Sequence, residues 1–270
     1  MNFIMKATLL MLVTCTFVYS LNLIAPQNKE IKGGEILYLG EIGPGQTVEL
    51  RLDPMVNVGG IYGDGGYYDT AIISSKPEGW SSTQSLLYAN PMWVTLSANP
   101  NAAEGEYYAN ITVIDERYGE KLDNITFTIK VKIKWDILDV SVTPTSVTVG
   151  PNQPAVYKIQ VTNKGAASDD YEISTVGTKK WDFRKPVFIP AHGTRTITYE
   201  VAASDEETYQ PVIKVVSRSS QNIHKEQKVA LTVKSDLKGD LKAINNGLLL
   251  FHVFEAPIYA LGGLISNLLG

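Results

Sequence analysis

The sequence contains little of the chemistry on which catalytic and metal sites are built. Its 270 residues include one cysteine, Cys15, and three histidines that lie far apart, His192, His224 and His252. A single cysteine excludes intramolecular disulfides, iron–sulfur clusters and zinc sites with several cysteine ligands. No serine, histidine and acid can be matched to a catalytic triad, which is recognised by its geometry, and no glycine-rich phosphate loop is present. We therefore expect a protein without enzyme activity and without a cofactor.

The chain also lacks an excess of positive charge. Its 24 lysines and arginines are outnumbered by 28 aspartates and glutamates, which gives a formal net charge of −4. A nucleic-acid partner requires a concentrated basic face that matches the phosphate backbone. The composition therefore predicts no nucleic-acid partner. The hydrophobic content of 44% predicts a folded rather than a disordered chain.

Helical periodicity over eleven or more positions is absent from residues 22–134. What is present is a series of short segments in which apolar and polar residues alternate, such as Thr47–Leu52 and Ile125–Ile133. This period of two belongs to a strand with one buried face. Glycine, proline and asparagine separate the segments and predict turns between the strands.

A second series of alternating segments begins at Trp135 and includes residues 155–162, Thr194–Val201 and Val212–Ser217. Short strands at intervals of about ten residues, with turns between them, predict a β-sandwich. The two series share the same order of strands and turns. We therefore predict an all-β protein with two tandem immunoglobulin-like β-sandwiches, residues 21–134 and residues 135–235.

The first twenty residues have the pattern of a secretory signal peptide. Lys6 precedes an apolar stretch at residues 7–13, and Val18 and Ser20 are small enough for the positions before a cleavage site. We predict a signal peptide at residues 1–20, cleavage after Ser20, and an exported protein on the extracellular or luminal side. Alternatives are an uncleaved anchor and, because residues 12–15 resemble a lipobox, lipidation of Cys15. Cleavage leaves no cysteine, so packing alone must stabilise the sandwiches.

Glycine, proline and aromatic residues recur at corresponding places in the two predicted sandwiches. The first contains KPEGW at 76–80 and ANPNAAEGEYY at 98–108; the second contains Gly150-Pro151, VTNKG at 161–165, Trp181 and AHGT at 191–194. These residues resemble the NEW3-type and CARDB-like immunoglobulin-fold modules of archaeal and bacterial surface proteins. The resemblance implies a spacer, an adhesion element or an accessory binding module. Structurally, the glycines permit turns and Trp80 supplies a large core residue.

Residues 57–69 (NVGGIYGDGGYYD) form the richest predicted loop. Three interpretations are open. Asp64 and Asp69, together with backbone carbonyls, form a calcium site; or Tyr62, Tyr67 and Tyr68 form an aromatic contact surface for a sugar or a protein; or the segment is a flexible loop without a ligand. The spacing of the acids does not match an EF-hand loop. A long loop at a sandwich end is a favourable contact surface in each case.

Asn110 and Asn124 each begin an N-glycosylation sequon, Asn-Ile-Thr. Both lie on predicted strands, with the asparagine on the face opposite the large apolar residues. We regard both as glycosylation candidates in an exported protein. The alternative is a chance match, which is common in a threonine-rich β chain.

The pattern changes after Ser235. Residues 236–246 are polar with apolar residues at helical spacing, and residues 248–270 are largely apolar. We predict a C-terminal helical tail, residues 236–270, that attaches the protein to a membrane through residues 248–270. Interruption by His252, Glu255 and Pro257 leaves three interpretations: an interfacial or re-entrant anchor, a transmembrane anchor, and a helical hairpin packed on a partner or within an oligomer.

These observations together predict a non-enzymatic, exported protein of the cell surface or envelope. Its tail attaches it to a membrane, and its sandwiches are presented to a protein or glycan partner in a structural or adhesive role. Two alternatives are a carbohydrate-binding accessory module and the luminal or extracellular subunit of a membrane protein complex.

Overall fold

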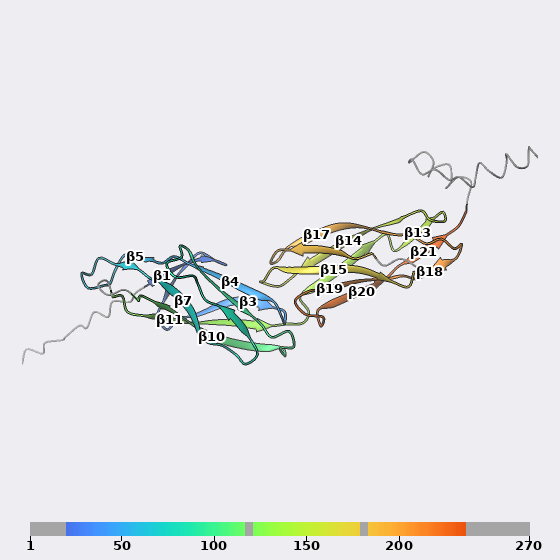
Figure 1. The fold of residues 1–270 in the computed structure, drawn as a ribbon. Helices are drawn as coiled ribbons and strands as arrows, with labels where there is room; N and C mark the ends of the chain where they lie inside the picture. The colour runs from blue at the N-terminus through green and yellow to red at the C-terminus, as the bar shows by residue number, and fades with distance from the viewer. Residues whose placement is uncertain (1–19, 117–120, 179–182, 236–270) are drawn as a thin grey trace, which may run out of the picture. The chain divides into compact units, whose positions relative to one another are not determined.

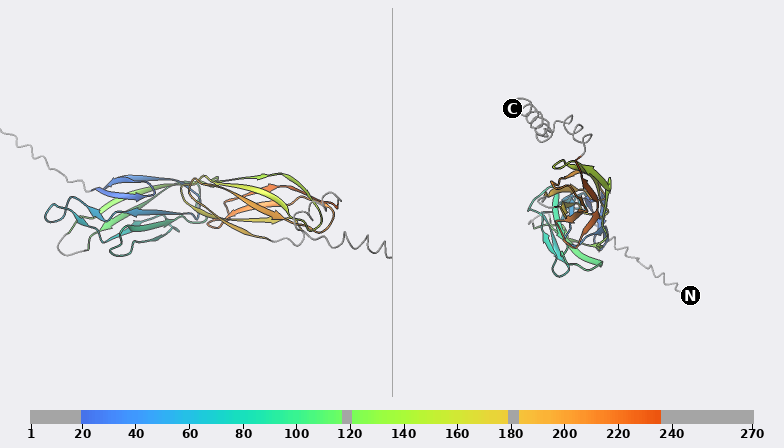
Figure 2. Two further views of the ribbon diagram at one scale, coloured as in Figure 1. Left: turned by 90° about the horizontal axis from the view of Figure 1, so that it is seen from above. Right: turned by 90° about the vertical axis from the view of Figure 1, so that its right-hand side faces the viewer.

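The computed structural model describes residues 20–116, 121–178 and 183–235, in which strands are the only regular elements. The chain divides into two compact units, each built around layers of strands (Figure 1, Figure 2). Among the described residues, the first unit consists of 20–39, Val48–Ser97, 106–116 and 121–131, and the second of Gly40–Thr47, Ala98–Gly105, 132–178 and 183–235.

The first sandwich contains a five-stranded sheet in the order β2-β1-β4-β9-β8 and a four-stranded sheet in the order β3-β11-β10-β7. The strands of the first sheet are β1 (Ser20–Ala25), β2 (Lys29–Lys32), β4 (Thr47–Leu52), β8 (Ser81–Thr83) and β9 (Met92–Ser97). Those of the second are β3 (Ile36–Ile42), β7 (Thr70–Ser75), β10 (Gly105–Ile114) and β11 (Ile125–Ile133). A further pair, β5 (Met55–Val56) and β6 (Gly66–Tyr67), forms a small sheet of its own.

The second sandwich contains sheets in the orders β12-β14-β17, β16-β15-β19-β20 and β13-β21-β18. The first comprises β12 (Leu138–Thr143), β14 (Ala155–Asn163) and β17 (Thr194–Val201). The second comprises β15 (Asp169–Val176), β16 (Lys185–Ile189), β19 (Val212–Ser217) and β20 (His224–Lys228). The third comprises β13 (Ser146–Val149), β18 (Thr208–Tyr209) and β21 (Ala230–Val233), with β13 parallel to β21.

The strand orders are those of an immunoglobulin-like sandwich, in which strands A, B, E and D form one sheet and C, F and G the other. In the first sandwich β1-β4-β9-β8 correspond to ABED and β7-β10-β11 to CFG. In the second, β12-β14-β17 correspond to ABE and β15-β19-β20 to CFG. Before strand F of the second sandwich the hydroxyl of Tyr209 donates to the carbonyl oxygen of Asp205 (3.2 Å), which is a tyrosine corner. The predicted all-β sandwich fold is confirmed.

Alternating apolar residues produce these sheets. In β11 the side chains of Ile125, Phe127, Ile129, Val131 and Ile133 are all buried, and the residues between them are half-buried or exposed. This strand and β4 have the bounds that the alternation predicted. A strand of this kind contributes its buried side chains to the space between two sheets, where the burial of apolar area provides most of the stability.

Trp80 is the core residue that its sequence motif predicted. Its side chain is buried, and its ring lies 5.2 Å from the ring of Tyr107, centroid to centroid. The preceding Gly79 has a φ of +74°, in the left-handed region that glycine adopts without strain. Trp181, the corresponding tryptophan of the second predicted sandwich, lies outside the described residues.

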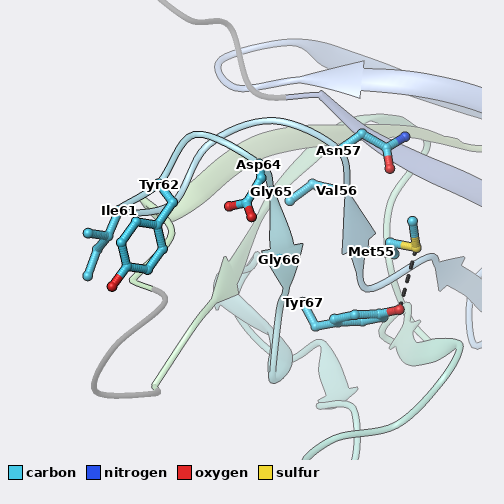
Figure 3. A pocket seen from close by; sticks show the side chains of 9 residues that line it. All are labelled: Met55, Val56, Asn57, Ile61, Tyr62, Asp64, Gly65, Gly66 and Tyr67. Carbon is cyan, nitrogen blue, oxygen red and sulfur yellow. Dashed lines mark hydrogen bonds between the residues drawn. The ribbon is translucent and has the colours of Figure 1, made fainter.

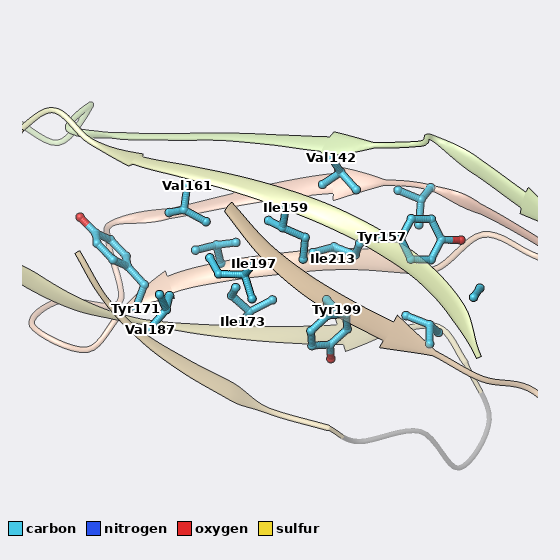
Figure 4. Packing of buried hydrophobic residues seen from close by; sticks show 14 of the residues in the cluster. Val142, Tyr157, Ile159, Val161, Tyr171, Ile173, Val187, Ile197, Tyr199 and Ile213 are labelled. Carbon is cyan, nitrogen blue, oxygen red and sulfur yellow. The ribbon is translucent and has the colours of Figure 1, made fainter. Parts of the chain in front are cut away.

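Tyrosines and aliphatic residues fill the second core (Figure 4). Tyr157 and Tyr171 are both buried there, with different surroundings for their hydroxyls. The hydroxyl of Tyr157 donates to the carbonyl oxygen of Ala230 (3.0 Å), and burial raises the pKa of Tyr157 to about 12. The hydroxyl of Tyr171 has no hydrogen-bond partner in the described part of the protein, and burial raises its pKa as well.

Two predicted segments fall outside the described residues. The signal peptide lies there except for Ser20, the first residue of β1, and so does the whole tail at residues 236–270. In the ranges that the structure does describe, no helix has the length and apolar character needed to cross a membrane.

The two core tyrosines form a matched pair for a stability measurement. Replacing Tyr157 with Phe removes a buried hydrogen bond, so we expect the unfolding free energy to fall by about 1 kcal/mol. Replacing Tyr171 with Phe removes a buried hydroxyl that bonds to nothing described, so we expect no loss or a small gain. Urea denaturation of both variants beside the wild type measures the difference, and equal losses would contradict it.

Alkaline pH gives the same comparison a second readout. The folded-state pKa of Tyr157, about 12, lies above the ordinary value of 10.0. Because the unfolded state ionises first, the contribution of Tyr157 to the unfolding free energy is complete below pH 10 and is lost as the pH rises toward 12. Tyr157→Phe cannot ionise at this position. Its stability deficit is therefore expected to shrink between these pH values.

Candidate interaction surface

Three connections lie at one end of the first sandwich, because successive strands of the sandwich alternate in direction. They join β4 to β7 (residues 53–69), β8 to β9 (residues 84–91) and β10 to β11 (residues 115–124, of which 117–120 are not described). We call this the loop end. Connections held by a rigid sandwich are a common location for binding residues.

The glycine-rich segment of the loop end is a β-hairpin. Val56 of β5 pairs with Gly66 of β6, and the N–H of Gly65 donates to the carbonyl oxygen of Gly59 (2.9 Å). Gly65 has a φ of +87°, and a Cβ there would lie 2.1 Å from the carbonyl oxygen of Val56. Glycine is therefore required at this position. The segment therefore contains a strand pair and is not wholly irregular; a loop without a ligand stays one interpretation of the sequence.

Asp69 joins the three connections to one another. Its side chain is fully buried, and its Oδ2 accepts the N–H of Glu116 (2.8 Å) from the β10–β11 connection. Its backbone carbonyl accepts the N–H of Tyr88 (2.8 Å) from the β8–β9 connection. The Glu116 N–H compensates one carboxylate oxygen for its lost hydration, whereas the Tyr88 N–H bonds to the main chain; through these two bonds Asp69 fixes the base of the loop end.

Tyr68 has a structural role at the same base, which corrects the prediction that it is a contact residue. Only 1% of its side chain is exposed, and its hydroxyl donates to the carbonyl oxygen of Asp123 (2.8 Å). The neighbouring residue Tyr67, the last residue of β6, lines the hairpin pocket instead. Tyr67 and Tyr62 remain exposed.

A pocket of about 420 Å³ lies on the hairpin (Figure 3). The hydroxyl of Tyr67 lies 3.6 Å from the sulfur of Met55 on one side of it. Tyr62 and Asp64 come from the tip of the hairpin (Figure 3). Aromatic rings, an amide and a carboxylate in one pocket provide both apolar and hydrogen-bonding contacts. The lining residues are Met55, Val56, Asn57, Ile61, Tyr62, Asp64, Gly65, Gly66 and Tyr67.

Large apolar side chains are exposed on two connections of the loop end. On the hairpin, 83% of Tyr62 and 63% of Ile61 are exposed; on the β8–β9 connection the fractions are 81% for Leu86, 51% for Leu87 and 58% for Tyr88. We call these five residues of the two connections the apolar patch. Large exposed apolar side chains on the connections at one end of a sandwich are candidate contact residues.

Leu86, Leu87 and Tyr88 were missed in the sequence interpretation. Their signal was present, because three large apolar residues in a row stand between Ser85 and the turn residues Asn90-Pro91. Such a run equally fits a buried strand, and only the pairing of the strands places it in a connection. Ser85 is buried and accepts the N–H of Ala71 (2.8 Å), which fixes the start of this run against β7.

The two calcium candidates have different surroundings. Asp64 is exposed and lines the hairpin pocket, whereas Asp69 is buried and bonded to Glu116. Within the described ranges, no group of three or more histidines, cysteines, aspartates or glutamates is placed to hold a metal ion. Calcium binding through Asp64 and Asp69 stays a prediction of the sequence.

The two sequon asparagines differ in exposure. Asn110 is on the outer face of β10, as predicted, but it is half-buried and its Oδ1 accepts the hydroxyl of Thr128 (2.9 Å). Asn124 is exposed and immediately precedes β11 instead of lying on it, because the strand begins at Ile125. Asn124 is therefore the more accessible candidate.

Comparisons with known proteins give no family for this chain. No family model and no curated protein matches it. Solved structures similar to it include fibronectin(III)-like modules of CbhA from Clostridium thermocellum (12% identity, 79% of this chain and 94% of that chain covered, TM-score 0.25). Another is a chimeric titin Z1Z2 (8% identity, 81% of this chain and 99% of that chain covered, TM-score 0.34). A third is the adhesin InvE of Yersinia pseudotuberculosis (14% identity, 72% of this chain and 57% of that chain covered, TM-score 0.30). These TM-scores are too low to carry an argument about function.

The role of Asp69 leads to a direct test. Replacing it with Ala leaves the N–H of Glu116 without its acceptor, so we expect a loss of about 1–3 kcal/mol in unfolding free energy. We also expect faster amide hydrogen exchange at Glu116. Asp64→Ala is the matched control, because Asp64 is exposed on the same hairpin, and its cost should stay within about 0.5 kcal/mol. Equal costs for the two variants would contradict a fastening role for Asp69.

Proposed function

We propose that this chain is a non-enzymatic, exported interaction module that contacts a partner at a cell surface through the loop end of its first sandwich. The observation that carries the proposal is the apolar patch on a base fixed by buried polar groups. Ile61, Tyr62 and Leu86 expose more than half of their surface, whereas Asp69, at the end of the β4–β7 connection, is buried and bonded. A preorganised apolar surface loses less conformational entropy on binding than a mobile one.

The wider assignment follows from the sequence. The predicted signal peptide favours export, and the NEW3/CARDB-like residues favour a spacer or adhesion module of a prokaryotic surface protein. The predicted attachment to a membrane through residues 248–270 completes the proposal: the tail holds the chain and the loop end binds. A surface or membrane-complex subunit attached in this way requires no catalytic residue.

A glycan is the second candidate partner, favoured by the hairpin pocket. Tyr62 and Tyr67 offer ring faces, and Asn57 and Asp64 offer hydrogen-bonding groups, around a volume of about 420 Å³. Sugars bind through this combination of ring stacking and hydrogen bonds.

The loop-end proposal is tested by binding of labelled protein that ends at Ser235, without the predicted membrane tail, to intact cells of the organism that makes it. We expect the double variant Tyr62→Ser/Leu86→Ser to weaken binding about tenfold or more, as for the loss of central apolar contact residues. The control is Ile36→Ser/Tyr38→Ser, which removes two exposed apolar residues from β3. Equal binding by both doubles would reject the loop end as the contact surface.

Pretreatment of the cells separates the two partner classes. Protease removes a protein partner, and periodate oxidises the vicinal diols of a glycan. Binding that survives protease but not periodate, and that requires Tyr67, favours the glycan candidate; the reverse pattern favours a protein.

Attachment by the tail is tested separately by fractionation of full-length protein beside a version that ends at Ser235. We expect full-length protein to pellet with membranes and to resist carbonate extraction, because residues 248–270 are largely apolar. The shortened version should stay in the supernatant. If both stay in the supernatant, the attachment proposal is wrong.

A further inference from the structure

The outer face of the β16-β15-β19-β20 sheet in the second sandwich gathers charged residues from distant parts of the sequence. Strand pairing sets Glu172 beside Val216 and Val216 beside His224 in one row, and Ser174 beside Lys214 in the next. Paired residues of neighbouring strands lie on the same face. These side chains therefore meet on the face that is turned away from the core.

A pocket of about 440 Å³ is formed on this face, and we call it the basic pocket. Its volume lies in the usual range of small-ligand sites, about 300–1,000 Å³. Val216 is its apolar member and Glu172 its single carboxylate, whereas three of its members carry a permanent positive charge. The lining residues are Glu172, Ser174, Arg184, Lys214, Val216, Ser217, Arg218, Gln221 and His224.

The positive charges of the basic pocket are only partly compensated. Arg184 lies 3.2 Å from Glu172, and Lys214 lies 3.1 Å from Glu226, each measured between a nitrogen and a carboxylate oxygen. Arg218 makes no ion pair with any residue in the described ranges. Its guanidinium is therefore the cation that is available to an anionic ligand, and guanidinium binds carboxylate and sulfate oxygens in a two-pronged geometry.

The backbone around Arg218 is held in place by buried bonds. The N–H of Arg218 donates to the carbonyl oxygen of Asp170 (2.8 Å). The hydroxyls of the residues on either side, Ser217 and Ser219, donate to the buried carboxylate of Asp169 (both 2.7 Å). Arg218 thus leaves a fixed base, as a preorganised binding residue requires.

The position of the basic pocket favours a saccharide over a peptide. β15 pairs with β16 and β19, and β19 pairs with β15 and β20, so the backbone groups of the two central strands are already used within the sheet, and a strand could be added only along the outer side of β16 or β20. A peptide that adds a strand needs a free sheet edge. A sugar needs only polar side chains for its hydroxyls, such as Ser174 and Gln221.

We propose that the basic pocket binds a saccharide with an anionic substituent, a carboxylate or a sulfate ester, with Arg218 bonded to the anionic group. This site lies in the second unit and is independent of the loop end of the first.

Calorimetric titration of the full-length protein at fixed ionic strength tests the proposal. The probes are a sulfated hexasaccharide, an oligogalacturonate, neutral maltohexaose, inorganic sulfate and an aspartate-rich peptide. We expect at least one of the acidic saccharides to bind and the neutral one not to bind. Arg218→Gln should weaken that binding about tenfold or more, as expected for a charge-assisted hydrogen bond. Ser174→Trp should abolish it, because the ring fills the pocket without changing its charge.

The control is Arg195→Gln, which changes the net charge equally but lies on β17, in the other sheet. We expect less than a twofold effect from it, and circular dichroism checks that each variant is folded. Arg218→Gln and Arg195→Gln could lose affinity for the acidic saccharide equally while Ser174→Trp binds as the wild type does. That result would mean a diffuse attraction between charges and would reject the pocket. Absence of binding by both acidic saccharides also rejects it, as does inorganic sulfate or an aspartate-rich peptide that binds as tightly as the saccharide.

Discussion

Both sandwiches depend on one constraint: each strand buries one face against the opposite sheet, with no disulfide between the sheets. The only cysteine, Cys15, precedes the described residues. The inner faces therefore have to supply the stability by close packing, as the isoleucines of β11 and the tyrosines of the second core do. The same constraint leaves the outer faces and the connections free of packing demands. Both candidate sites lie on such surfaces.

Buried carboxylates determine where those surfaces are rigid. Asp69 in the first sandwich and Asp169 in the second are each buried, and each accepts hydrogen bonds from residues of a neighbouring connection. A buried charge without such donors would cost roughly several kcal/mol in desolvation. The hydrogen bonds between the donors and the carboxylate are therefore kept in the folded protein. The consequence for function is local. Tyr88 is bonded to Asp69, and Arg218 stands between two serines bonded to Asp169.

The sequence predicted those parts of the fold that local alternation determines. β4, β11 and β17 have the expected bounds because apolar residues occur at every second position in them. β7 was missed because buried Thr70 and Ala71 are adjacent, which breaks the alternation. The sequence also did not show that Tyr67 is exposed and Tyr68 is buried, since the register of the hairpin decides which of the two faces the core. Pairing between strands about forty residues apart brings Glu172 and Val216 together, and no local pattern contains that information.

The net charge of the chain also gave no indication of the basic pocket as a site for an anionic ligand. The chain is acidic overall, at −4, and this argues against a long polyanion that would contact much of its surface. A single anionic group interacts mainly with the charges that lie near it, because salt screens charges beyond about 8 Å at physiological ionic strength. The lining of the basic pocket itself carries Arg184, Lys214 and Arg218 against the one carboxylate of Glu172, while Glu226 is paired with Lys214 and Asp169 is bonded to Ser217. A local excess of cations on an acidic protein selects for a ligand that is small or sparsely charged. That selection distinguishes an acidic saccharide at one pocket from nucleic acid along a whole face.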